Sequence, residues 1–198
     1  MLIRWFCGLL VWLLALGASA QGVLPVPALS SHVIDSTATL TSAQQQALDG
    51  KLAAFESSSG TQLVVLMVPT TQPEDIASYA QRIGDAWKIG RKGVGDGLLL
   101  VVAKNDRKMR IEVAKSLEGA IPDLAAKQII DTAITPRFKQ DDYAGGVDAG
   151  VDRIMGLIKG EALPAPAAQA GMDVSRDDFQ WGPMLAFLFF VVMIGGGI

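Results

Sequence analysis

The sequence predicts an α/β protein: a three-layer α/β/α sandwich with a small mixed sheet, followed by a C-terminal transmembrane helix. Two continuously apolar, valine-rich runs, residues 62–68 (QLVVLMV) and 98–103 (LLLVVA), are typical of central strands that are buried on both faces. A helical pattern of apolar residues lies between them in residues 73–87. Two strands joined through a helix form a parallel pair, so the centre of the sheet should be parallel.

The first helix is predicted from its ends as well as from its apolar face. "TSAQ" at residues 41–44 is a capping box, in which the threonine and the glutamine satisfy free backbone groups reciprocally. Leu48, Leu52 and Phe55 recur at helical spacing, and Gly60 supplies the stop. The second helix should begin at Pro73, after the first buried strand.

The remaining elements follow the second buried strand. Residues 104–107 form a tight turn, and residues 108–113 (KMRIEV) alternate apolar and charged side chains, as in a strand with one wet face. These two strands should form an antiparallel hairpin. A third helix begins near Asp123 and is ended by Pro136, and a fourth carries apolar residues at helical spacing from Tyr143 onward. Helices should therefore cover both faces of the sheet.

The N-terminal residues 1–20 are predicted to be a signal peptide. A positive charge at Arg4 is followed by an apolar run and by the small residues Ala18-Ser19-Ala20, which are typical of a cleavage site. The alternative is a short anchor that stays uncleaved. Cleavage would leave residues 21–160 as the folded domain and would remove Cys7, the only cysteine. Disulfides, thiol catalysis and thiolate metal sites are then excluded from the mature chain.

The C-terminal part divides into a linker, residues 161–180, and an apolar segment, residues 181–198. That segment has 18 residues and no charge, near the lower limit for a membrane-spanning helix, and a packed core helix is the alternative. We expect secretion across the inner membrane, anchoring by the C-terminal helix, and a domain on the extracytoplasmic side of the cell envelope. The expected partners are the lipid bilayer and an integral membrane protein or complex.

Two classes of ligand are excluded by charge and by motif order. The formal charge is −3, or −4 without Arg4, and no long basic run exists, so no nucleic acid is expected. Gly90, Gly93, Gly95 and Gly97 resemble a phosphate-binding loop, but the order here is helix, loop, strand, whereas a P-loop follows a strand and opens a helix. No nucleotide is expected either.

Three carboxylates remain as candidate metal ligands. The predicted hairpin returns the chain to the edge where it starts, so Asp96, Glu118 and Asp123 should gather there. Carboxylate oxygens without histidine or cysteine suit calcium, and Mg2+ is not excluded. The alternatives are a helix N-cap for Asp123 and a solvated loop position for Glu118. At the opposite edge, Asp35 and Arg107 are predicted to form an ion pair.

Five blocks of sequence, in order, resemble the TPM domain family of YgcG-like bacterial envelope proteins, which is related to the plant thylakoid lumen protein of photosystem II repair. The blocks are HVIDSTATLTSAQQQAL, GTQLVVLMV, WKIGRKGVGDGLLLVVAKNDRKMRIEV, SLEGAIPD and PRFKQDDYAGGVDAGVDRI. The resemblance implies an α/β/α sandwich and divalent-cation binding, with calcium in some members. It also implies one of two functions: a non-enzymatic accessory factor in assembly, repair or quality control of membrane protein complexes, which we favour, or a metal-dependent acid phosphatase.

Overall fold

The computed structural model describes residues 22–160, which fold around one four-stranded mixed sheet. Its strands are β1 (Val33–Asp35), β2 (Gln62–Val68), β3 (Gly97–Ala103) and β4 (Lys108–Val113), in the order β1-β2-β3-β4. The first three strands are parallel, and β3 and β4 are antiparallel. The parallel pair and the hairpin predicted from the sequence are both confirmed.

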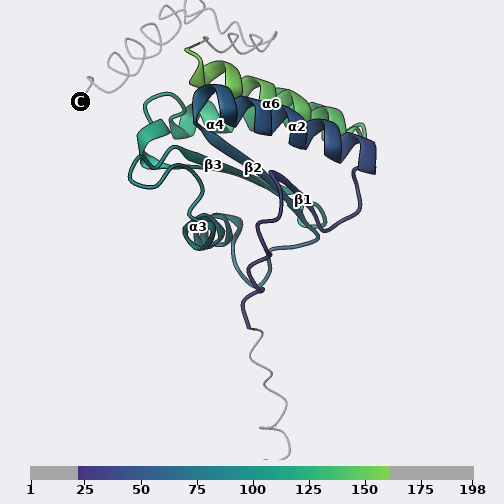
Figure 1. The fold of residues 1–198 in the computed structure, drawn as a ribbon. Helices are drawn as coiled ribbons and strands as arrows, with labels where there is room; N and C mark the ends of the chain where they lie inside the picture. The colour runs from purple at the N-terminus through teal and green to yellow at the C-terminus, as the bar shows by residue number, and fades with distance from the viewer. Residues whose placement is uncertain (1–21, 161–198) are drawn as a thin grey trace, which may run out of the picture. The chain divides into compact units, whose positions relative to one another are not determined.

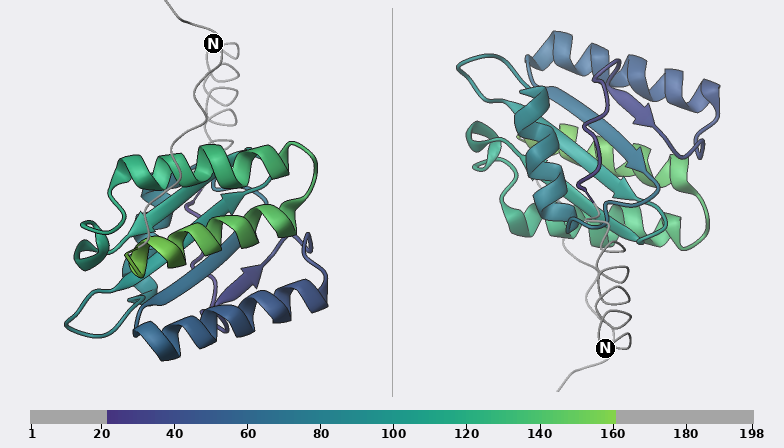
Figure 2. Two further views of the ribbon diagram at one scale, coloured as in Figure 1. Left: turned by 90° about the horizontal axis from the view of Figure 1, so that it is seen from above. Right: turned by 90° about the horizontal axis from the view of Figure 1, so that it is seen from below.

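Helices cover both faces of this sheet (Figures 1 and 2). One face carries α2, α4 and α6, and α3 lies on the other (Figure 1). The bounds are α2 Ser42–Ser59, α3 Ile76–Trp87, η1 Lys115–Leu117, α4 Asp123–Ile129, the π-helix η2 Ile130–Ile134, α5 Thr135–Phe138 and α6 Tyr143–Ile158.

The strands β2 and β3 are apolar along their length because each one contributes side chains to two hydrophobic cores, one on each face of the sheet. Leu63, Val65 and Met67 point to the face of α2 and α6, whereas Val64 and Leu66 point to α3. All of these side chains are fully buried. Burying one such side chain contributes about 1.5–3 kcal/mol, so both faces of the sheet stabilise the fold.

The structure differs from the prediction in one additional strand and in the residue at which one helix begins. The strand β1 was not predicted; it is only three residues long and is joined to β2 through bonds such as Val65 N–H to His32 O at 2.8 Å. The second helix begins at Ile76 rather than at Pro73, because the Asp75 side chain accepts the free N–H groups of the first turn. Both differences arise from hydrogen bonds that periodicity does not reveal.

Pro136 does not end the third helix, contrary to the prediction. The helical path continues through η2 into α5, and Pro136 lies in the first turn of α5. Thr135 N–H bonds to Ile130 O, five residues back, which is the wide turn of a π-helix. Proline has no N–H and interrupts the ordinary ladder, so a wider turn just before it keeps the chain helical.

The predicted signal peptide, linker and transmembrane segment lie outside the described residues. Within residues 22–160, none of the helices combines the length and the apolar character that crossing a bilayer requires.

Candidate functional site

Asp96, the first predicted metal ligand, is a buried carboxylate that closes the glycine loop. Its side chain is 5% exposed, and its two oxygens accept hydrogen bonds from the backbone N–H and the Nε–H of Arg91, both at 2.7 Å. Arg91 Nη2 lies 2.5 Å from the same carboxylate. The loop is tightened further where Val94 and Gly95 donate to Arg91 O at 3.0 Å. Asp96 therefore holds Arg91 in place from five residues away.

The charge of Asp96 is maintained by these bonds. Burial on its own would raise the pKa of this carboxyl, but the side-chain and backbone hydrogen bonds from Arg91 outweigh burial and lower the pKa below its usual value. Asp96 is consequently a carboxylate whose charge is balanced by a guanidinium. In this state it has a structural role, and a cation would have to displace Arg91 to reach it.

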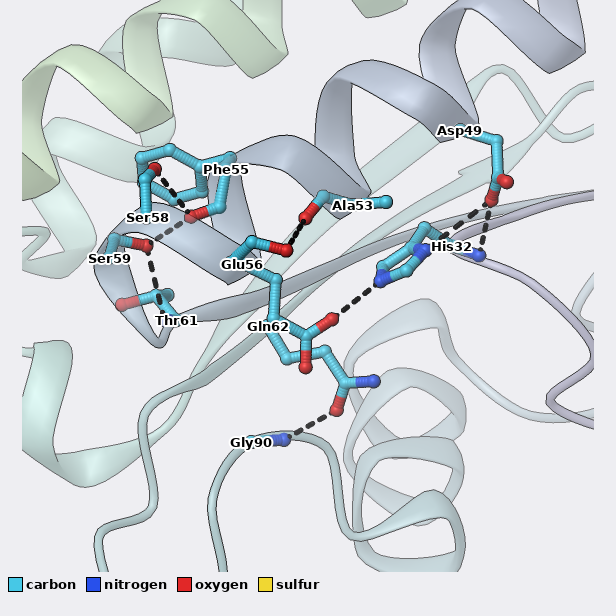
Figure 3. A network of polar contacts seen from close by, with 11 residues as sticks. His32, Asp49, Ala53, Phe55, Glu56, Ser58, Ser59, Thr61, Gln62 and Gly90 are labelled. Atoms are coloured by element: carbon cyan, nitrogen blue, oxygen red, sulfur yellow. Dashed lines mark hydrogen bonds and ion pairs between the residues drawn. The ribbon is translucent and has the colours of Figure 1, made fainter.

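The glycines at both ends of the loop allow a close backbone approach. A Cβ added to Gly90 would lie 2.5 Å from Gly97 N, and one added to Gly97 would lie 2.1 Å from Ile89 O. The loop is also fixed to the start of β2, because Gly90 N–H donates to Gln62 Oε1 at 2.8 Å (Figure 3). These glycines therefore let the chain pass from α3 into β3 with its backbone segments closely packed.

The other two predicted ligands are exposed. Glu118 follows η1, and the segment that carries it is placed against the glycine loop by the bond from Ser116 Oγ to Gly95 O at 2.7 Å. Asp123 is the first residue of α4 but not its N-cap, which is Pro122. Within residues 22–160, no three or more His, Cys, Asp or Glu side chains form a group that could hold a metal ion. The site at Asp96, Glu118 and Asp123 is not preformed and stays a prediction.

His32, the single histidine, lies between two carboxylates of α2 (Figure 3). Its Nε2 is 2.6 Å from Glu56 Oε2, and its Nδ1 is 3.4 Å from Asp49 Oδ1. The His32 backbone N–H also donates to Asp49 Oδ1 at 2.7 Å. These contacts fasten the segment before β1 to α2. Sequence reasoning missed them because the partners are 17 and 24 residues away.

At the opposite edge, Asp35 organises the loop between β1 and α2. One oxygen accepts from Thr37 N–H and the other from Thr39 N–H and Leu40 N–H, all at 2.8 Å. Burial would raise the pKa of Asp35, but the bond from Leu40 N–H and the bonds from Thr37 and Thr39 together lower it. Within the described residues Asp35 makes no ion pair, so the predicted pair with Arg107 is wrong. Backbone N–H groups take the place of the guanidinium.

The loops that follow β1, β2 and β3 are joined by side chains at this edge. Asp106 accepts from Thr70 Oγ1 at 2.8 Å and from Thr71 N–H at 2.9 Å. Lys104 Nζ donates to Thr39 Oγ1 at 3.0 Å. The carboxyl ends of the three parallel strands therefore share one polar layer.

A cavity of about 440 Å³ lies beside this layer, between the turn after β3 and the start of α6. We call it the basic pocket. Its apolar lining includes Phe138 and Tyr143, whose rings are 4.9 Å apart. Its polar lining includes four cationic side chains and one acid, namely Lys104, Arg107, Lys108, Lys139 and Asp141. Sequence reasoning missed the pocket because its residues come from two distant segments.

Fold and site together define a small α/β/α domain whose buried acid and single histidine are held by internal partners. Its sequence matches the TPM domain over residues 33–157, and the chain belongs to the TPM domain family. None of the curated proteins compared with it matches.

Solved structures that are similar to the chain include the following three. The N-terminal domain of a P. gingivalis protein is 28% identical, with a TM-score of 0.61 over 66% of this chain and 83% of that one. The BA42 protein of the psychrophilic bacterium Bizionia argentinensis is 19% identical, with a TM-score of 0.54 over 63% and 91%. The N-terminal domain of cg2496 from Corynebacterium glutamicum is 16% identical, with a TM-score of 0.53 over 76% and 97%. The last two show a shared fold alone.

Proposed function

We propose that this chain is a membrane-anchored, extracytoplasmic TPM domain that acts as a non-enzymatic accessory factor in assembly, repair or quality control of membrane protein complexes. One observation carries the non-enzymatic part: the side chains best suited to acid–base chemistry are committed to internal bonds. Asp96 is held by Arg91, and His32 lies between Asp49 and Glu56. A general base must be able to reach the proton that it abstracts, whereas these groups contact side chains of the same domain.

The experiment that tests the non-enzymatic part is a turnover assay with p-nitrophenyl phosphate from pH 4 to 8, with calcium, magnesium or a chelator. We expect no turnover above that of the Asp96→Asn variant. Metal-dependent turnover that disappears in Asp96→Asn would establish the phosphatase alternative and overturn the proposal.

Calcium binding is part of the proposal and would require the glycine loop to rearrange. The Arg91 side chain is 58% exposed, so it can leave Asp96 without breaking a core, and the segment that carries Glu118 is adjacent through Ser116. Removing the guanidinium with Arg91→Ala should therefore tighten calcium binding in calorimetry, and Asp96→Asn should abolish it. Calcium affinity that is the same in wild type and in both variants would exclude this site.

Anchoring is tested by fractionation. The full chain should sediment with membranes and be cut by protease added to spheroplasts, whereas a chain that lacks residues 181–198 should be released into the soluble extracytoplasmic fraction. Release of the full chain, or protection from the protease, would overturn the proposed topology.

A further inference from the structure

The basic pocket has the dimensions and the lining of a ligand site. Pockets that hold small ligands are typically about 300–1,000 Å³, mostly apolar, with a few polar groups placed to fix orientation. This one has a volume of about 440 Å³, with the rings of Phe138 and Tyr143 on its apolar side. It is formed at the carboxyl end of β3, where open α/β sheets commonly bind ligands.

Its cations differ in how far they are already engaged. Lys104 Nζ is bonded to Thr39 and lies 4.9 Å from the centre of the Tyr143 ring, so it is fixed in place. The side chains of Arg107 and Lys139 are exposed and form no ion pair or side-chain hydrogen bond within the described residues. These two are available to an incoming anion.

Arg107 has a backbone conformation that is unusual for an arginine. Arg107 has a φ of 53°, and its N–H bonds to Lys104 O across the four-residue turn. A left-handed residue at this place in a hairpin is ordinarily glycine, because only glycine adopts it without steric cost. An arginine is present instead, and Asp141 on the pocket lining also has a positive φ, of 58°. Residues held in such conformations concentrate at ligand sites.

The surroundings favour a carboxylate over a phosphate. Phosphate sites usually use free N–H groups at a helix N-terminus. The helix start beside the pocket is that of α6, and its N–H at Gly145 is already bonded to Asp142 Oδ1 at 2.9 Å. Asp141 also lines the pocket and would repel a dianion more than a monoanion.

We propose that the basic pocket binds an acidic peptide segment: a carboxylate is held by Arg107 and Lys139, and a neighbouring apolar side chain packs on Phe138 and Tyr143. A guanidinium binds a carboxylate through two parallel hydrogen bonds, and the aromatic rings supply apolar contact beside it. The inference rests on the proposed function in so far as the domain is a binding module, and it names the chemistry of the partner.

The test measures fluorescence anisotropy of labelled peptides with the full chain in detergent, at low salt and at 0.5 M salt. Three probes separate the possible sources of the carboxylate: Gly-Ser-Asp-Phe-Gly amide, its Asn analogue, and Gly-Ser-Gly-Ser-Phe with a free C-terminal carboxylate. Inorganic phosphate serves as a competitor. We expect the Asp peptide or the free-carboxylate peptide to bind, the Asn analogue to bind at least tenfold more weakly, and phosphate to compete poorly.

Arg107→Gly is the decisive variant because it removes the side chain and places glycine where the backbone favours it. It should raise the Kd of the bound peptide about tenfold while the melting temperature stays equal or rises. Lys139→Gln should raise the Kd about threefold, as expected for one screened charge. Lys92→Gln is the matched control: it removes the same charge from the exposed glycine loop at the other edge and should leave the Kd unchanged.

Three results would overturn the inference: equal binding of the Asp and Asn peptides, equal weakening by Lys92→Gln and Arg107→Gly, or phosphate competing more strongly than the peptides. The first would remove the carboxylate, the second would reduce binding to net charge, and the third would change the ligand class. None of these results bears on membrane anchoring or on the absence of turnover, so failure here is distinguishable from failure of the proposed function.

Discussion

Asp96→Asn separates a structural role of this residue from a metal-binding one. In the structure the carboxylate accepts two charge-assisted bonds from Arg91, each at 2.7 Å. Such bonds contribute about 1.5–3 kcal/mol each, but the bond to the Arg91 side chain must be discounted to about 0.5 kcal/mol because that side chain is largely exposed. The asparagine oxygen can keep one bond, while its NH2 group would face a guanidinium. The expected loss is about 2 kcal/mol of the free energy of unfolding.

That loss should lower the melting temperature by about 6 °C for a domain of this size, measured by circular dichroism in a chelator. The pH dependence follows from the lowered pKa of Asp96. A carboxyl with a lowered folded-state pKa contributes stability above its unfolded pKa of about 4 and loses it as pH falls through the folded-state pKa. The difference between wild type and variant should therefore shrink below about pH 4.

Glu118→Gln is the matched control, since it makes the same chemical change at an exposed position and should alter stability by less than about 0.5 kcal/mol. An Asp96→Asn variant as stable as wild type in the chelator would refute the structural role. Suppose that calcium raised the melting temperature of the wild type but not that of this variant. Asp96 would then be a calcium ligand rather than a residue that stabilises the loop by binding Arg91.

Three further predictions concern residues that position the loops and helices. Gly90→Ala places a Cβ 2.5 Å from Gly97 N at a φ of 98°, so it should cost about 3 kcal/mol or more, seen as a large fall in melting temperature. Asp35→Asn should destabilise the domain in urea at pH 7, and the difference from wild type should shrink as the pH falls below about 4, because the lowered pKa of Asp35 means that its contribution is lost as pH falls through the folded-state pKa. Gly150→Ala brings a Cβ to 2.6 Å from Ile134 Cδ1, a side-chain end that can shift, so a loss of about 1–2 kcal/mol is expected in the same assay.

The fold could be predicted where a local pattern carried the whole signal. The runs at β2 and β3 predicted two-sided burial because every residue after Gln62 and after Gly97 is apolar, and both cores use these runs. β1 could not be found in this way, since three residues show no period and its bonds are to a strand about 30 residues away. Pro136 misled the prediction for a different reason: proline excludes one hydrogen bond, and the π turn at η2 avoids the need for it.

Of the candidate site, only the place of Asp96 in the fold could be predicted, and the gathering of Asp96, Glu118 and Asp123 stays a prediction. The sequence placed Asp96 among glycines directly before the second buried strand, where the structure has it, but the expected exposure of Asp96 is wrong, because its side chain is only 5% exposed. Its partner was not anticipated, although Arg91 is only five residues away, because spacing in an irregular loop does not indicate which side chains meet. The glycines did indicate a tight loop, and in a tight loop with one acid and one arginine these two side chains can form an ion pair.

The two ends of the sheet, at the amino and the carboxyl ends of the parallel strands, should have different roles. The chain leaves β1 toward α2 on one face and leaves β2 toward α3 on the other, so neighbouring connections diverge at the carboxyl ends of the strands. The basic pocket lies at the same end of the sheet, lined by the turn after β3 and by residues from α5 to the start of α6. The glycine loop enters β3 at the amino end, where Asp96 is buried and bonded, whereas Arg107 follows the carboxyl end with an exposed side chain. Substitutions at the amino edge should therefore change stability more than binding, and Arg107→Gly should do the reverse.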